Sequence, residues 1–301
     1  MKIHLIRNTV KILALVTLVS MSSCKKDVTD VTNPNSGNSG AANLSDSSTA
    51  ADNMYYDVLN NAFVSYSDNT GKMSSSGSQS GKTTTFSTEA VNGTETHMGC
   101  AIYTLDDSIP NSYPKTLIAD FGSGCTSADG IFRKGKLTFV FSGPIYFPGA
   151  TISVTFTQYV VNGYGLQGTY LITNNSTGSG DLVINTKVTN GIITYPSLVN
   201  YHYSHNKTYT LTYGMDTPLD ITDDVYNISG NSAFSDAAGN SLVFNVTTPL
   251  VKAMSCHNVS KGVVGFSYNQ NINGTIDFGD GTCDNLATVT VGDIHRTVIL
   301  R

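Results

Sequence analysis

From residue 83 to the end of the chain, apolar and polar residues alternate with a period of two. The apolar members of four such runs are Leu137, Phe139 and Phe141; Ile152, Val154 and Phe156; Leu182, Ile184 and Val188; and Tyr209, Leu211 and Tyr213. Successive side chains of a strand point to opposite faces, so each run predicts a strand with one buried and one solvated face. We expect an all-β body: an antiparallel meander of hairpins, packed as a sandwich or as one long curled sheet, with one short N-terminal helix.

Four Asn-Gly pairs are expected to form turns between these strands, at residues 92–93, 162–163, 190–191 and 273–274. Asn and Gly both tolerate the positive φ angles that a type I′ hairpin turn requires. The sequence shows no alternation of strands with helices. This pattern argues against a Rossmann or barrel enzyme scaffold.

The N-terminal part of the chain divides into three segments after residue 23. Residues 24–52 are rich in Asn, Ser, Gly and Thr, a composition that predicts a flexible tether. Residues 53–82 are expected to hold one short helix, over 53–66, and a Ser/Gly-rich linker. The helix is indicated by apolar residues at helical spacing, with Asp52 as its cap: Tyr55, Val58, Leu59, Ala62 and Phe63. The β-rich body then covers 83–301, with two related halves, about 83–175 and 176–301.

A short motif occurs twice, each time between two cysteines. The first copy runs from Cys100 through Asp120-Phe121-Gly122 to Cys125, and the second from Cys256 through Asp277-Phe278-Gly279 to Cys283. The repeat favours the disulfides Cys100–Cys125 and Cys256–Cys283, each closing a loop of roughly 25 residues and contributing about 3–4 kcal/mol. Free buried thiols are the alternative. A zinc site would need closer ligand pairs, such as Cys-x-x-Cys.

Residues 1–23 have the features of a targeting segment. Lys2, Arg7 and Lys11 precede an apolar stretch over 12–19, which is too short to span a bilayer stably, and the sequence Met21-Ser22-Ser23-Cys24 follows. This resembles the lipobox of bacterial lipoproteins, in which the cysteine is acylated and becomes the new N-terminus. The resemblance implies a membrane anchor at Cys24. An ordinary secretory signal is the alternative, and either route leads to an oxidising space.

The residues after Cys24 bear on the membrane to which the anchor attaches. In Gram-negative lipoproteins, Asp directly after the cysteine is associated with inner-membrane retention, and this chain has Lys25 there. The resemblance therefore implies the outer membrane. Asp27 and Asp30 are similar to the acidic patch of surface-exported lipoproteins, which implies a position facing the cell exterior, with the periplasmic face as the alternative.

Charge excludes one class of partner. The chain has 17 Lys and Arg against 22 Asp and Glu, and the targeting segment holds three of the basic residues and none of the acidic ones. The mature chain is therefore distinctly acidic. Nucleic acid needs a basic surface, so we expect no nucleic-acid partner.

The second copy of the repeated motif is similar to the core signature of polycystic-kidney-disease (PKD) type immunoglobulin-like domains. The resemblance covers about six residues, from Asp277 to Thr282, and the aromatic that usually precedes the first Asp is Ile276 here. Three carboxylates of this region, Asp277, Asp280 and Asp284, are weak candidates for a Ca²⁺ site, since Ca²⁺ takes several oxygen ligands. The alternative is that Asp and Gly form a tight bulged turn.

Four tyrosines cluster around one predicted hairpin: Tyr201, Tyr203, Tyr209 and Tyr213. Exposed, they would form a platform on which sugars stack. The alternative is that they fill cross-strand pairs and stabilise the sheet. His202 and His205 are three residues apart, which places them on opposite faces of a strand and argues against a shared metal.

We find no sequence pattern that indicates catalysis or a cofactor. The chain as a whole is similar to β-rich lipoproteins of Gram-negative bacteria that have no assigned activity, a resemblance that implies location and fold. We expect a non-enzymatic surface lipoprotein that binds an extracellular glycan or protein. The alternatives are a structural or envelope-assembly lipoprotein that acts through its sheet edges or a partner, and a secreted hydrolase.

Overall fold

The computed structural model describes residues 36–68, 83–87, 100–106, 112–178, 180, 182–217 and 221–300. These described residues belong to one compact unit. The targeting segment, Cys24, the predicted linker and Asn92-Gly93 lie outside the described residues. Within the described part, no helix is both long and apolar enough to cross a membrane.

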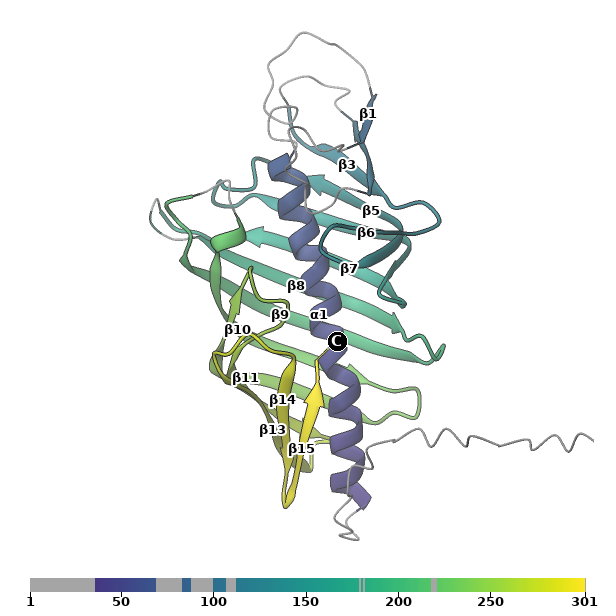
Figure 1. The fold of residues 1–301 in the computed structure, drawn as a ribbon, viewed down its shortest axis with the longest axis vertical. Coiled ribbons are helices and arrows are strands. Elements are labelled where there is room, and N and C mark those ends of the chain that lie inside the picture. The colour runs from purple at the N-terminus through teal and green to yellow at the C-terminus, as the bar shows by residue number, and fades with distance from the viewer. Residues whose placement is uncertain are drawn as a thin grey trace, which may run out of the picture. The chain divides into compact units, whose positions relative to one another are not determined.

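The described strands form a single antiparallel sheet, in which each strand apart from the short β4 pairs with the next along the chain (Figure 1). The strands are β1 Thr83–Ser87, β2 Ile102–Asp106, β3 Lys115–Asp120, β4 Cys125–Thr126, β5 Phe132–Phe141, β6 Thr151–Val161, β7 Tyr164–Asn174, β8 Val183–Thr194, β9 Asn200–Tyr213, β10 Val225–Ser235, β11 Ser241–Ala253, β12 Lys261–Tyr268, β13 Ile272–Asp280, β14 Leu286–Val291 and β15 Ile294–Ile299. β4 is a short side branch on β5, and a single 3₁₀ turn, Ile221–Asp223, precedes β10. The predicted meander is confirmed, as one curled sheet and not a sandwich.

Glycine bulges bend this sheet. The register of β5 against β6 shifts around Gly135, and that of β10 against β11 shifts around Gly230. Their φ angles are 78° and 118°, and a Cβ on either glycine would lie 2.2 Å from a backbone oxygen of the neighbouring strand. Only glycine fits such positions, and a bulge increases the bend and twist of its strand.

The Asn-Gly predictions have mixed outcomes. Asn162-Gly163 forms the turn between β6 and β7, with φ angles of 48° and 87°, as expected. Asn190-Gly191 and Asn273-Gly274 lie inside β8 and β13, so their prediction as turns is wrong. In β8, Asn190 takes its positive φ at a register shift against β9. The conformation that favours a hairpin turn is used here for a bulge.

The single helix of the described residues, α1, runs from Ser36 to Asp68. The predicted short helix over 53–66 is therefore only its second half, and the flexible-tether prediction for 24–52 is wrong from Ser36 onward. The first half is built from small residues that are fully or almost fully buried: Ala41, Ala42, Ser45, Ala50 and Ala51. Small side chains let a helix approach other elements closely, so the low apolar content reflects close packing.

Helix α1 lies across one face of the sheet and crosses its strands (Figure 1). It contacts β7 near the middle of the sheet, and it contacts β11, β13, β14 and β15, the strands that come last along the chain. At the centre, Tyr55 of α1 stacks on Tyr203 of β9 with ring centroids 5.1 Å apart, and its hydroxyl donates to the carbonyl of Gln167, 2.8 Å away. The inward face of the curled sheet and α1 thus share one core.

Candidate functional site

Both cysteine pairs form the predicted disulfides, Cys100–Cys125 and Cys256–Cys283. In each copy of the repeat, a hairpin follows the first cysteine and the Asp-Phe-Gly triplet ends or closely follows its second strand. The hairpins are β2–β3 and β12–β13, towards opposite ends of the sheet. The repeat is therefore a disulfide-closed hairpin.

The aspartate of each triplet caps a turn. Oδ1 of Asp120 accepts from the amide of Gly122, and Oδ1 of Asp277 accepts from the amide of Gly279, both at 2.9 Å. Asp280 accepts from the amide and hydroxyl of Thr282 in the same way.

The Ca²⁺ candidates serve as such turn caps. Asp284 likewise accepts from the amide of Leu286, so each of Asp277, Asp280 and Asp284 caps its own turn. In the part of the chain that the structure describes, no group of three or more His, Cys, Asp or Glu residues is placed to hold a metal ion. These contacts are those of Asp residues in tight turns, which was the alternative to a Ca²⁺ site.

The loops beside the two disulfides both line one cleft of about 650 Å³ over α1. The lining comes from five segments: the loop after Cys125, with Ala128, Asp129 and Ile131; the end of β6 and the turn after it, with Val161 and Asn162; Thr222 of the 3₁₀ turn; the end of β11 and the loop to Cys256 and His257; and one side of α1 from Asn53 to Asn60. Ligand pockets of proteins have volumes of roughly 300–1,000 Å³. The segment that follows the first disulfide and the loop that begins the second repeat therefore both line a cleft of ligand-binding size.

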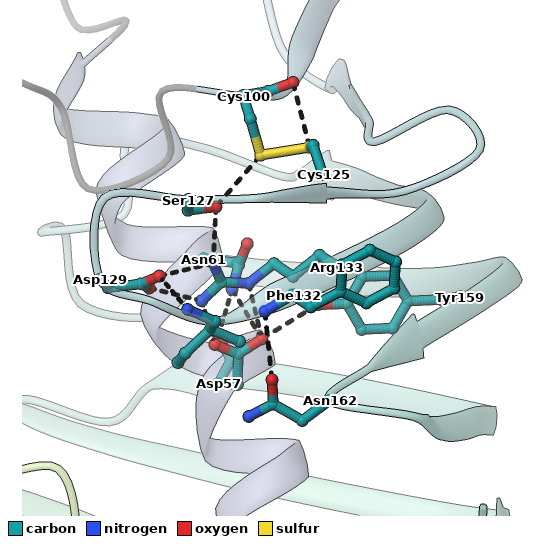
Figure 2. A network of polar contacts seen from close by, with 11 residues as sticks. Asp57, Asn61, Cys100, Cys125, Ser127, Asp129, Phe132, Arg133, Tyr159 and Asn162 are labelled. Atoms are coloured by element: carbon teal, nitrogen blue, oxygen red, sulfur yellow. Dashed lines mark hydrogen bonds and ion pairs between the residues drawn. A yellow bond between two sulfur atoms is a disulfide. The ribbon is translucent and has the colours of Figure 1, made fainter. Parts of the chain in front are cut away.

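Behind the first loop lies a buried arginine (Figure 2). Nε and Nη2 of Arg133 donate to the carboxylate of Asp57 on α1, and Nη1 and Nη2 donate to Asp129 at 3.2 and 2.7 Å. Nη1 also donates to Oγ of Ser127 at 2.8 Å. The Arg133 side chain is fully buried, and all five of its N–H groups have an acceptor.

Asp57 is equally well satisfied. Besides Arg133, it accepts from the hydroxyl of Tyr159 at 2.9 Å and from the side-chain amide of Asn61 at 3.1 Å. Burial alone would lower the pKa of Arg133, but the Asp57 and Asp129 carboxylates outweigh it and raise that pKa. Burial, with the charge of Asp57, raises the pKa of Tyr159 well above its usual value. Arg133 therefore stays charged and Tyr159 stays neutral at ordinary pH.

The network also reaches the first disulfide. Oγ of Ser127, which accepts from Arg133, lies 3.3 Å from Sγ of Cys100. The loop that lines the cleft is thus held at one end by the disulfide and at the other by the ion pairs with α1 (Figure 2). A wall fixed in this way keeps its shape before any ligand arrives.

Lys252 of β11 also lines the cleft and is 3% exposed. Its Nζ donates to the carbonyl oxygen of Cys256 and lies 4.8 Å from the ring centroid of Tyr56. No carboxylate in the described part of the chain forms an ion pair with it. Burial lowers the pKa of Lys252 to about 8.

Amide side chains converge on the same cleft. The Oδ1 of Asn60 is buried and has no hydrogen-bond partner among the described residues. Asn162 accepts from the amide of Phe132 at 3.1 Å through Oδ1, so its Nδ2 remains at the rim (Figure 2). Asn53 donates to Oδ1 of Asn258 at 2.8 Å. His257 is exposed at the edge. Amides of this kind offer both donors and acceptors to a ligand.

The four predicted tyrosines do not form a platform. Tyr203 and Tyr209 are 3% and 4% exposed, among the buried side chains of the core shared with α1. Tyr201 is half-buried and stacks on Phe234 with centroids 4.7 Å apart, and only Tyr213 is well exposed, at 65%. The stacking-platform hypothesis is therefore wrong for Tyr203 and Tyr209, because the helix occupies the face towards which they point.

Tyr203 instead belongs to a second buried network of polar side chains. Its hydroxyl donates to Asp52 of α1, which also pairs with Lys207 at 2.7 Å. His205 contacts the Tyr203 hydroxyl through Nδ1 at 3.1 Å and Thr186 through Nε2 at 3.0 Å. His202 is exposed whereas His205 is buried, as expected for opposite faces of β9. A cavity of about 40 Å³ adjoins this hydrogen-bonded network. The cavity is too small for an organic ligand.

The residues that define the cleft were missed at the level of sequence. Arg133 and Lys252 occupy inward positions of their strands, where the alternation calls for apolar side chains. A charged residue at such a register position is the available signal. No family model matches the chain, and neither a curated protein nor a solved structure shows significant similarity to it.

Proposed function

We propose that the protein is a membrane-anchored, non-enzymatic lipoprotein whose cleft binds a short unit of an extracellular glycan. The observation that carries the proposal is the 650 Å³ cleft lined by the loops next to the two disulfides, with the unpaired Oδ1 of Asn60 in its lining. A buried acceptor without a partner costs free energy, and a ligand donor removes that cost. Sugar hydroxyls are donors and acceptors together, which suits a site lined by amides.

The charges around the cleft favour binding over catalysis. Glycoside hydrolysis uses two carboxyl groups with free access to the substrate. The two carboxylates in the cleft, Asp57 and Asp129, both bind Arg133. They are occupied in holding the wall to the helix.

A screen of immobilised oligosaccharides tests the binding proposal. The protein used is the mature chain, residues 24–301, with Cys24→Ala so that it stays free of lipid. We expect retention on part of the array, and at least tenfold weaker retention for Asn60→Ala. Asn227→Ala is the matched control, because Asn227 is an exposed amide on β10. An array without any retained sugar, or equal binding by both variants, contradicts the proposal.

Location is a separate part of the proposal. It rests on the lipobox resemblance at Cys24. Protease shaving of intact cells should remove the β-rich body from wild-type cells, and Cys24→Ala should release the protein from the membrane fraction. Protection in intact cells, with cleavage after lysis, would place the body in the periplasm.

The envelope-assembly alternative rests on the free edge of the sheet. β15 is the last strand in the described sheet, so no further strand of that sheet pairs with its outer edge. Ile299 on this strand is 62% exposed. Exposed strand edges recruit further strands. Periplasmic protection in the shaving experiment would favour this alternative.

A further inference from the structure

Helix α1 pairs its carboxylates with cations from the inner face of the sheet. Asp46 binds Arg296 of β15 at 2.8 Å, Asp52 binds Lys207 of β9 at 2.7 Å, and Asp57 binds Arg133 of β5. In each case a carboxylate of the helix compensates a cation that the sheet directs towards it. Buried charges in proteins are generally paired in this way, because an unpaired buried charge is costly.

Lys252 is an inward cation that breaks this pattern. The part of α1 that faces it supplies the Tyr56 ring, and no carboxylate of the described residues lies within ion-pair distance. The carbonyl of Cys256 takes one of its three N–H groups. The ammonium therefore keeps further donors and an uncompensated charge, and it lines the 650 Å³ cleft.

We propose that the cleft recognises an acidic sugar, a uronic acid unit whose carboxylate pairs with Lys252. This inference rests on the proposed glycan-binding function and names its ligand class. The carboxylate supplies for Lys252 the partner that α1 supplies for the other three cations. The remaining hydroxyls of the sugar meet the acceptor of Asn60 and the amide of Asn162.

The charges next to the loop after Cys125 orient such a ligand. Arg133 is shared by two carboxylates, so that cluster carries one net negative charge, and the Asp129 side chain is 19% exposed. It repels the carboxylate of the ligand and accepts from hydroxyl groups. The carboxylate of the sugar is thereby directed to Lys252, and its hydroxyl groups are directed to the loop after Cys125.

Matched acids and esters test the inference. Isothermal titration calorimetry compares oligomers of galacturonate, glucuronate and mannuronate with their methyl esters, using the lipid-free mature chain. For each uronate oligomer that binds, we expect an affinity at least tenfold higher than that of its methyl ester. Lys252→Met should abolish that difference and leave the weaker ester affinity in place. Lys187→Met, on the outer face of β8, should keep the difference.

Lys252→Met is also expected to fold. Methionine has a similar length and removes an unpaired buried charge, a change that is often neutral or stabilising. Its melting temperature should not fall below that of wild type.

The outcomes separate this inference from the proposed function. Equal affinity for acid and ester, or an unchanged preference in Lys252→Met, overturns the inference while glycan binding stands. Retention of neutral sugars on the array without binding of any uronate does the same. No retained sugar of either kind overturns both.

Discussion

At the scale of single residues, Arg133 offers the sharpest test of the buried network. Arg133→Met leaves Asp57 and Asp129 without their counter-charge, so we expect a loss of about 3–5 kcal/mol in the free energy of unfolding. Lys136→Met is the control: Lys136 pairs with Asp120 at 2.7 Å, but its side chain is 48% exposed, and a surface pair contributes about 0–1 kcal/mol. Urea denaturation measures both. Equal losses would contradict a structural role for the network.

The buried position of His205 leads to a prediction of how the free energy of unfolding changes at acidic pH. Burial, together with the charge of Lys207, lowers its pKa from 6.5 to about 3. The unfolded chain then binds the proton more readily than the folded protein, so stability falls as the pH drops below about 6.5. Between pH 6.5 and 4.5 we expect His205 to account for a loss of about 2 kcal/mol.

A variant isolates this contribution. In His205→Gln, the glutamine amide can still contact Tyr203 and Thr186 but does not titrate. Chemical denaturation at several pH values should give a flatter stability profile for the variant over this range. Parallel profiles for the two proteins would show that His205 is not the group responsible.

At the scale of elements, the strands were predictable and the helix only in part. Inward residues such as Leu137, Phe139 and Phe141 are all fully buried, so the period of two located both strand and face. The first half of α1 was missed because its Ser, Thr and Asn residues resemble a linker. There the structure uses Ser45, Ser48 and Thr49 hydroxyls to bond to carbonyls of the preceding helical turn. A sequence window cannot show that a sheet covers such a segment.

Truncation tests the role of the first half of α1. A chain of residues 36–301 should keep the cooperative unfolding of the mature protein. A chain of residues 53–301 loses the ion pairs of Asp46 and Asp52 and the buried alanines, so we expect it to lose most of its stability or fail to fold. Circular dichroism melting curves compare them. If the shorter chain melts like the longer one, residues 36–52 do not belong to the core.

At the scale of the whole molecule, the sequence indicated which cysteines are joined within each hairpin. It did not indicate the cleft that distant segments form together. The repeated Cys and Asp-Phe-Gly pattern correctly predicted both disulfides, because each lies within a local hairpin. The cleft depends on Ile131, Lys252 and Asn60, which come from three distant segments. Its position follows from the curl of the sheet around α1, and isolated glycines such as Gly135 and Gly230 are a local sign of that curl.

The disulfides provide the last prediction, because they act on stability and on the cleft together. Cys256→Ala with Cys283→Ala should lower the free energy of unfolding by about 3–4 kcal/mol, since the unfolded chain regains the freedom of a 27-residue separation. It should also weaken ligand binding, because the carbonyl of Cys256 positions Lys252. Denaturation and calorimetry on the same samples measure both effects. Lost stability with unchanged affinity would mean that the loop keeps its shape without the disulfide, and that packing alone fixes that wall of the cleft.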